Sequence, residues 1–171
     1  MSAFIFDDCI FSKDLKVECD RQGLVSTQRL EDDLRGKEDC IVLPAIVNRG
    51  SVLVTEDRRM AEENAEFLSN DHPGLLVVAS EESTKTLTGR LVRAILNRLK
   101  SVLPNWHSVT MRNSIVEVTQ RTVFVYHADR GTIHYDRHMP LDDPKMLEDL
   151  VTILNRNASK PWSRTLPTGA E

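Results

Sequence analysis

The chain has 171 residues, of which 40% are hydrophobic and 28% charged, and its formal net charge is −4. These values are typical of one soluble globular domain and exclude collagen-like, low-complexity and largely disordered chains. The acidic balance also excludes a global basic field, so any binding of nucleic acid must come from a local patch. Three cysteines without a CxxC spacing favour reduced thiols in the cytoplasm over a disulfide framework or a zinc site.

Nothing in the sequence predicts a contact with a membrane. No apolar run approaches the roughly 18 residues of a membrane helix. Asp7 and Asp8 interrupt the apolar N-terminal segment, which a signal peptide would not tolerate. We therefore expect a cytoplasmic protein without a membrane partner.

The first 80 residues alternate between short apolar runs and helical patterns. The apolar runs predict strands at residues 3–6, 51–55 and 75–79. The helical patterns predict helices at residues 12–22, 27–35, 39–49 and 58–70. Pro44 counts against a regular third helix unless it lies in the first turn. This alternation predicts a parallel sheet with helices on both faces.

The second half of the chain has a different pattern. A long amphipathic helix is predicted at 84–103, and strands are predicted at 114–119, 122–127 and 132–135, with a turn at 128–131. This pattern predicts an antiparallel ribbon at the edge of the sheet. The last helix, 143–156, has Leu147, Leu150, Val151 and Leu154 directed inward. We expect one domain over residues 1–156 and a mobile tail over 157–171.

Acidic residues follow two of the predicted strands and begin one predicted helix. Asp7 and Asp8 follow the first strand, Glu56 and Asp57 follow the second, and Asp39 opens the helix that precedes the second strand. Strand ends and helix starts of this kind lie on the same edge of a parallel sheet. Carboxylates gathered there repel one another unless a divalent cation binds, and oxygen ligands favour Mg²⁺ or Mn²⁺. Such a site can activate water and stabilise charge on a phosphodiester.

The same acids also have a simpler interpretation. Asp39 and Asp57 each stand where the N-cap of a helix is expected, and acids are common at helix starts. Spacing alone does not decide between caps and metal ligands.

Three segments of the sequence resemble PIN-like domains. Residues 4–10 (FIFDDCI) are similar to the opening strand and acid of that family, and residues 36–43 (GKEDCIVL) to an acid at the start of a helix. Residues 48–57 (NRGSVLVTED) resemble the third motif, a polar turn and a strand followed by Thr-x-Asp. The three motifs occur in the family's order over residues 3–80, and the chain is most similar to the compact branch related to VapC-type toxins. The extension over 104–156 lies beyond these motifs.

The resemblance implies a three-layer α/β/α fold and a metal-dependent ribonuclease. It assigns Asp7, Asp39 and Asp57 as the catalytic ligands of Mg²⁺ or Mn²⁺, and Thr55 as a residue that orients the site through hydrogen bonds. It further implies an RNA substrate, an antitoxin as protein partner and a homodimer. The family's further acid is replaced by Arg59 here.

Acids near that position are candidates to replace the missing one. They are Asp8, Glu56 and Glu63. Arg58 and Arg59, beside the proposed site, are either ligands of RNA phosphates or part of a solvated helical turn. His127, His134 and His138 are close in sequence, and we interpret them as structural or surface residues and not as a zinc site.

Two other functions remain open from the sequence. A receiver-like phosphoacceptor domain also has an acidic pair after its first strand and a later aspartate. A degenerate PIN scaffold, which only binds a protein or RNA partner, would account for the missing acid.

Overall fold

The described strands form one sheet with parallel and antiparallel pairs. The computed structural model describes residues 4–7, 27–29, 34, 36–78, 111–119 and 121–159. The strands are β1 (Phe4–Phe6), β2 (Thr27–Arg29), β3 (Val52–Thr55), β4 (Leu75–Val78), β5 (Ile115–Val118), β6 (Thr122–Asp129) and β7 (Thr132–Pro140). The helices are α2 (Asp39–Asn48), α3 (Met60–Glu63), α4 (Ala65–Leu68) and α6 (Met146–Ser159).

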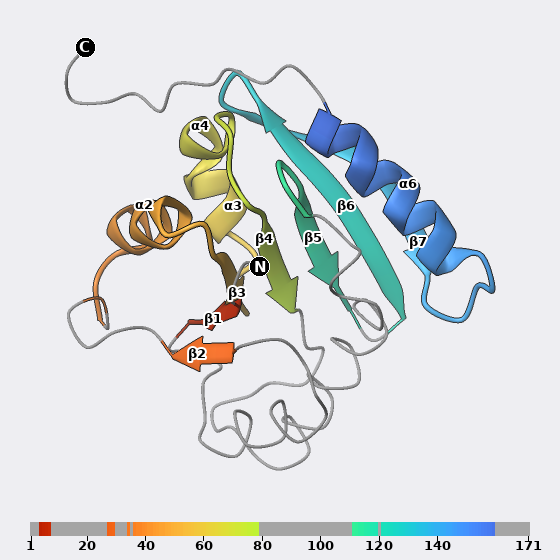
Figure 1. Cartoon of the computed structure of the whole chain (residues 1–171), viewed down its shortest axis with the longest axis horizontal. Helices are drawn as coiled ribbons and strands as arrows, with labels where there is room; N and C mark the ends of the chain where they lie inside the picture. Colours follow the sequence, from red (N-terminus) through yellow and green to blue (C-terminus); the bar gives the residue numbers. More distant parts are fainter. Residues whose placement is uncertain are drawn as a thin grey trace.

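The seven strands lie in the order β2-β1-β3-β4-β5-β6-β7. The first five pair in parallel, and β6 and β7 continue the sheet as antiparallel strands (Figure 1). This confirms the predicted α/β class, the mainly parallel sheet and the antiparallel C-terminal ribbon. Among the described residues, no helix is long and apolar enough to cross a membrane.

Apolar side chains pack on both faces of the sheet. On one face, alternate residues of β1, β3, β4, β5 and β6 pack with buried residues of α6, such as Leu150 and Leu154. On the other face, the intervening residues pack with α2, α3 and α4, through Leu43, Met60 and Leu68 among others. In Figure 1, α6 (blue) lies against β6 and β7 on the opposite side of the sheet from α2 (orange). The central strands are buried on both faces, which explains their continuous apolar sequences.

Helix α2 forms although Pro44 lies within it, beyond the first turn. The helix ends sharply because Gly50 adopts a φ of 69°, which favours glycine. Its N–H donates to the carbonyl of Val47 (2.9 Å), and the N–H of Ser51 donates to that of Ile46 (3.2 Å). This pair of bonds closes the helix and reverses the chain into β3. Helix α2 therefore runs antiparallel to β3, and its first residue lies toward the carboxyl end of the sheet.

Two of the predicted helices are corrected. The helix expected over 27–35 is wrong at its start, because Thr27–Arg29 form β2 and pair with β1. A central strand that is apolar on both faces needs a hydrogen-bonding partner on each side, and this tertiary requirement outweighs local helix propensity. The helix expected over 58–70 is divided at Asn64, whose side-chain amide donates to the carbonyl of Met60 (2.9 Å). The helices expected over 12–22 and 84–103 lie outside the described residues.

The C-terminal hairpin confirms the predicted turn and is longer than expected. Arg130 and Gly131 both have positive φ, 52° and 77°, which is typical of a tight two-residue hairpin turn. Strand β7 continues to Pro140, and a β-bulge interrupts its pairing with β6. Val125 pairs with Arg137 and Tyr126 pairs with Tyr135, so Asp136 is the extra residue. The bulge places Asp136 and Arg137 on the same face, where both contact α6.

Helix α6 packs against the hairpin, as the pattern of residues 143–156 predicts. Leu150 and Leu154 are buried, and Val151 packs at the border of the same core. The helix begins at Met146 and extends to Ser159, three residues beyond the predicted end. Asn157, which was expected to begin the tail, is fully buried. The rest of the expected tail, 160–171, lies outside the described residues.

Candidate functional site

Thr55 links two of the predicted acids at the carboxyl end of the sheet. Asp7 follows β1, and its N–H donates to the carbonyl of Val54 on β3 (2.8 Å). The buried Thr55 hydroxyl donates to Oδ2 of Asp7 (2.8 Å) and accepts the N–H of Asp57 (3.1 Å). A continuous chain of hydrogen bonds therefore runs from Asp57 through Thr55 to Asp7, and it fixes one carboxylate oxygen of Asp7.

The third predicted acid, Asp39, is the first residue of α2. Because α2 is antiparallel to β3, the backbone of Asp39 lies toward the same edge of the sheet as Asp7 and Asp57. The side chain of Asp39 and the whole of Asp8 lie outside the described part of the structure. Among described side chains, no group of three or more His, Cys, Asp or Glu residues has the arrangement of a metal site. The three-acid metal centre therefore stays a prediction, although carboxylate oxygens are the right donors for Mg²⁺ or Mn²⁺.

The N-caps expected at Asp39 and Asp57 are wrong, because Glu38 and Arg59 hold the N-cap positions of α2 and α3 and make no side-chain capping bond. Asp57 instead contacts the turn before α3. Its Oδ1 accepts the N–H of Arg59 (2.9 Å), and Nε of Arg59 lies 3.7 Å from the same oxygen. The contact supports the turn into α3. About a third of the Asp57 side chain (32%) stays exposed. Glu56, also proposed as a supporting residue, is half-buried beside it.

Arg58 reaches across the sheet to an acid that sequence reasoning missed. Its Nε lies 3.6 Å from Oε2 of Glu117 on β5, while 58% of the Arg58 side chain remains exposed. Only 17% of the Glu117 side chain is exposed. Glu117 interrupts an apolar strand, Ile115–Val118, and this interruption is the signal in the sequence that could have identified it. Glu63, an alternative fourth acid, is exposed on α3.

The sheet register aligns these residues with the C-terminal hairpin. Across successive strands, Thr55 pairs with Val77, Val77 with Glu117, Glu117 with Phe124, and Phe124 with His138. Paired residues lie on the same face, here the face that α2, α3 and α4 cover in part. One row of side chains therefore leads from the acids to the edge strand β7.

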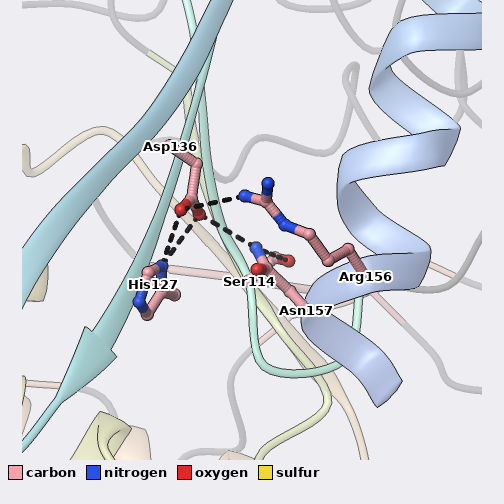
Figure 2. Close-up of polar contacts among 5 residues, drawn as sticks. All are labelled: Ser114, His127, Asp136, Arg156 and Asn157. Carbon is pink, nitrogen blue, oxygen red and sulfur yellow. Dashed lines mark hydrogen bonds and ion pairs between the residues drawn. The ribbon is translucent and has the colours of Figure 1, made fainter. Parts of the chain in front are cut away.

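A second polar cluster connects the hairpin to α6, and Figure 2 shows its members. Nδ1 of His127 lies 2.8 and 3.0 Å from the two carboxylate oxygens of Asp136. The same carboxylate accepts the amide of Asn157 (3.0 Å) and the guanidinium of Arg156 (3.3 Å). The Asn157 amide also donates to the hydroxyl of Ser114 (3.0 Å).

The contacts of this cluster are structural, because they hold α6 against the hairpin; we call the cluster the junction with α6. Only 4% of the Asp136 side chain is exposed, so its charge needs these donors. Its contacts agree with the interpretation of His127 as a structural residue. The sequence does not reveal the cluster, because Asp136 reaches it only through the bulge. His134 stacks on His127 with ring centroids 5.1 Å apart, and His138 lies on the opposite face, in contact with Tyr135.

An open cavity of about 430 Å³ lies at the opposite end of the sheet from the acids. Its walls come from the end of α2 and the segments before β4 and β5, and include Asn48, Asp71, His72 and Arg112. Asp71 and Arg112 form a two-pronged ion pair, with Nε 2.7 Å from Oδ1. Burial lowers the pKa of His72 to about 4, a shift that the charge of Asp71 opposes. Nδ1 of the uncharged His72 accepts the N–H of Gly74 (3.1 Å). This contact stabilises the turn before β4 and is separate from the acid site.

Comparison of the chain with protein-family models, curated proteins and solved structures found no match. The resemblance to PIN-like domains therefore rests on the three sequence motifs alone.

Proposed function

We propose that this chain is a PIN-like ribonuclease that hydrolyses RNA phosphodiesters with Mg²⁺ or Mn²⁺. The observation that supports this most directly is the hydrogen-bonded chain from Asp57 through Thr55 to Asp7. It brings two acids that are 50 positions apart in sequence to one edge of the sheet, with the orienting threonine of the third motif between them.

Each residue has a defined role in this proposal. Asp7, Asp39 and Asp57 hold the cation, which supplies an activated water and a counter-charge for the phosphate. Thr55 orients Asp7 through the 2.8 Å hydrogen bond. Arg58 and Arg59, whose side chains are 58% and 78% exposed, bind backbone phosphates of the RNA.

The biological role follows from the resemblance alone. A nuclease of this branch would act as the toxin of a toxin–antitoxin pair, restrained by a small antitoxin protein, and it would form a homodimer. Both partners belong to the proposal.

A receiver-like phosphoacceptor domain is the second candidate, and the strand order favours keeping it. The first five strands follow the order 2-1-3-4-5, which CheY shares with flavodoxin. Asp7 follows β1 and Asp57 follows β3, as an acid pocket of that kind requires. Against it, the residue after β5 is Thr119 and Arg121 comes two positions later, so the lysine expected at the end of the last parallel strand is missing there.

Replacing Asp7 with Asn tests the proposed function. Asp7→Asn removes one negative charge and little volume, so we expect Mn²⁺-dependent RNA cleavage to fall by about 100-fold or more with the fold intact. Cleavage of a fluorogenic RNA measures the rate, and circular dichroism checks the fold. Asp142→Asn, an exposed loop acid, is the matched control and should keep full activity.

Undiminished cleavage by Asp7→Asn would contradict the site. Incorporation of phosphate from acetyl phosphate, lost in Asp57→Asn, would favour the receiver-like function. A chain that binds neither Mn²⁺ nor acetyl phosphate would leave the degenerate scaffold as the explanation.

A further inference from the structure

Four aromatic rings form a continuous layer on one face of the C-terminal hairpin. Phe124 and Tyr126 come from β6, and Tyr135 and His138 come from β7. Neighbouring ring centroids lie 5.9 to 6.4 Å apart, and each ring contacts at least one ring of the other strand. We call these four residues the aromatic platform.

The bulge at Asp136 produces the platform. In a regular strand, Tyr135 and His138 are three residues apart and point to opposite faces. The extra residue between them restores both to one face, where the Tyr135 hydroxyl contacts Nδ1 of His138. Tyr135 is 54% exposed and His138 is also exposed, so part of the platform faces solvent. A contiguous layer of aromatic side chains that reaches solvent is typical of a binding surface.

The platform is aligned in the sheet with the proposed active site. Phe124 and Glu117 are paired, and Thr55 lies in the same row two strands beyond Glu117. Three strand spacings separate Thr55 from Phe124, so the distance between them across the sheet is about 14 Å. Arg58 covers part of this interval, because it follows Asp57 in sequence and contacts Glu117. Burial raises the pKa of the platform residue Tyr126, the charge of Glu117 raises it further, and the charge of Arg58 opposes this shift.

We infer that the aromatic platform binds the bases of single-stranded RNA, and that Arg58 and Arg59 bind the phosphates between the platform and Asp7. Aromatic rings stack with any unpaired base, and arginines beside them neutralise the backbone. This combination provides the local binding patch that a chain of net charge −4 needs for a nucleic acid. The inference rests on the proposed function and assigns the path of its substrate.

The occupant favoured by these observations is a nucleic acid and not a second protein. A strand that pairs with the β7 edge would use its backbone and would not require rings on the sheet face. Arg58, which contacts Glu117 beside Phe124, and Arg59, which contacts Asp57, complement an anionic polymer. The side chain of Arg58 is still more than half exposed while it contacts Glu117, so it remains accessible to a phosphate.

RNA binding without cleavage tests this inference. The probe is a fluorescein-labelled oligoadenylate, titrated with the full chain in EDTA and followed by fluorescence anisotropy. We expect Tyr135→Ala and His138→Ala each to weaken binding by about 10-fold, and Tyr135→Phe to retain it. His134→Ala is the matched control, because His134 is exposed on the same strand but stacks on His127 on the other face. Its affinity should not change.

A second measurement separates this inference from the proposed nuclease activity. Tyr135→Ala should raise KM for a long RNA, whereas the control His134→Ala should leave that KM unchanged. If Tyr135→Ala binds oligoadenylate as well as the unmodified chain, the platform is not the RNA site, whatever Asp7→Asn does. If Tyr135→Ala leaves RNA affinity unchanged and abolishes self-association in sedimentation, the platform is a protein interface and the inference is wrong.

Discussion

His72 shows how one buried side chain makes the stability of this protein depend on pH. The residue is fully buried in the turn before β4, and its Nε2 has no hydrogen-bond partner among the described residues. Burial disfavours the charged imidazolium, which lowers the pKa in the folded state from 6.5 to about 4. Between these two values the unfolded chain binds a proton that the folded chain does not. Stability therefore rises with pH across this window.

We expect the free energy of unfolding to be highest above pH 6.5 and to fall by about 3 kcal/mol as the pH decreases toward 4. His72→Asn removes the titrating group, and its Oδ1 still accepts the N–H of Gly74, so the pH dependence in this window should flatten. Urea unfolding at a series of pH values measures the effect. His134→Asn, at an exposed position, is the control. An equally steep dependence in His72→Asn would assign it to other groups.

At the scale of elements, two ion pairs join α6 to the hairpin and differ in burial. Asp136 is nearly inaccessible and accepts hydrogen bonds from His127, Arg156 and Asn157. Arg137 and Asp149 form the other pair, with Nη2 3.0 Å from Oδ2 and both side chains partly exposed. A buried carboxylate with several donors contributes to stability, whereas an exposed pair contributes little.

This difference gives a paired prediction. Asp136→Asn should lower the free energy of unfolding by about 2 kcal/mol. The carboxylate accepts several hydrogen bonds through both oxygens, whereas the amide replaces one of these oxygens with an NH2 group, which donates. Asp149→Asn should lower it by less than about 1 kcal/mol. Chemical denaturation of both variants measures the difference. Equal effects would mean that the buried cluster does not hold α6 in place.

At the scale of the whole molecule, α6 covers the face of the sheet that the hairpin extends. Met146, Leu150 and Leu154 pack on Val123, Val125 and Met139, in a core shared with β1, β3 and β4. Because this core extends from β1 to β7, loss of α6 should affect the parallel strands as well.

Truncation after Pro140 tests this dependence. We expect the shortened chain to aggregate or to unfold at a clearly lower temperature, since a continuous apolar surface becomes exposed. Size-exclusion chromatography and thermal unfolding measure both effects. A truncated chain that is soluble, monomeric and as stable as the full one would show that α6 is not part of the core.

Much of this architecture could be predicted from the sequence, and the exceptions have a common cause. Val52–Thr55 and Leu75–Val78 are recognisable because their composition is that of buried parallel strands, and Arg130-Gly131 because its turn needs positive φ. The motif predicts that Thr55 orients the site through hydrogen bonds, and the structure supplies its partner, Asp7. Thr27–Arg29 were assigned wrongly because their structure depends on pairing with a distant strand. Glu117 and Asp136 were missed because their roles depend on strand register, which local patterns do not contain.

Because of its bulge, strand β7 can lose one residue without inverting the faces of its side chains. Met139 and Ile133 are six positions apart, yet they pack on opposite faces of the sheet, as residues an odd number of positions apart do in a regular strand. Deletion of Asp136 alone would make the interval odd, and every other side chain of β7 would keep its face. If Tyr135 or Arg137 were deleted instead, Asp136 would occupy the paired position of the deleted residue, and its carboxylate would replace that side chain. The codon of Asp136 can therefore be lost without inverting the strand, and this loss would remove the polar cluster around Asp136 while leaving Tyr135 and His138 on one face.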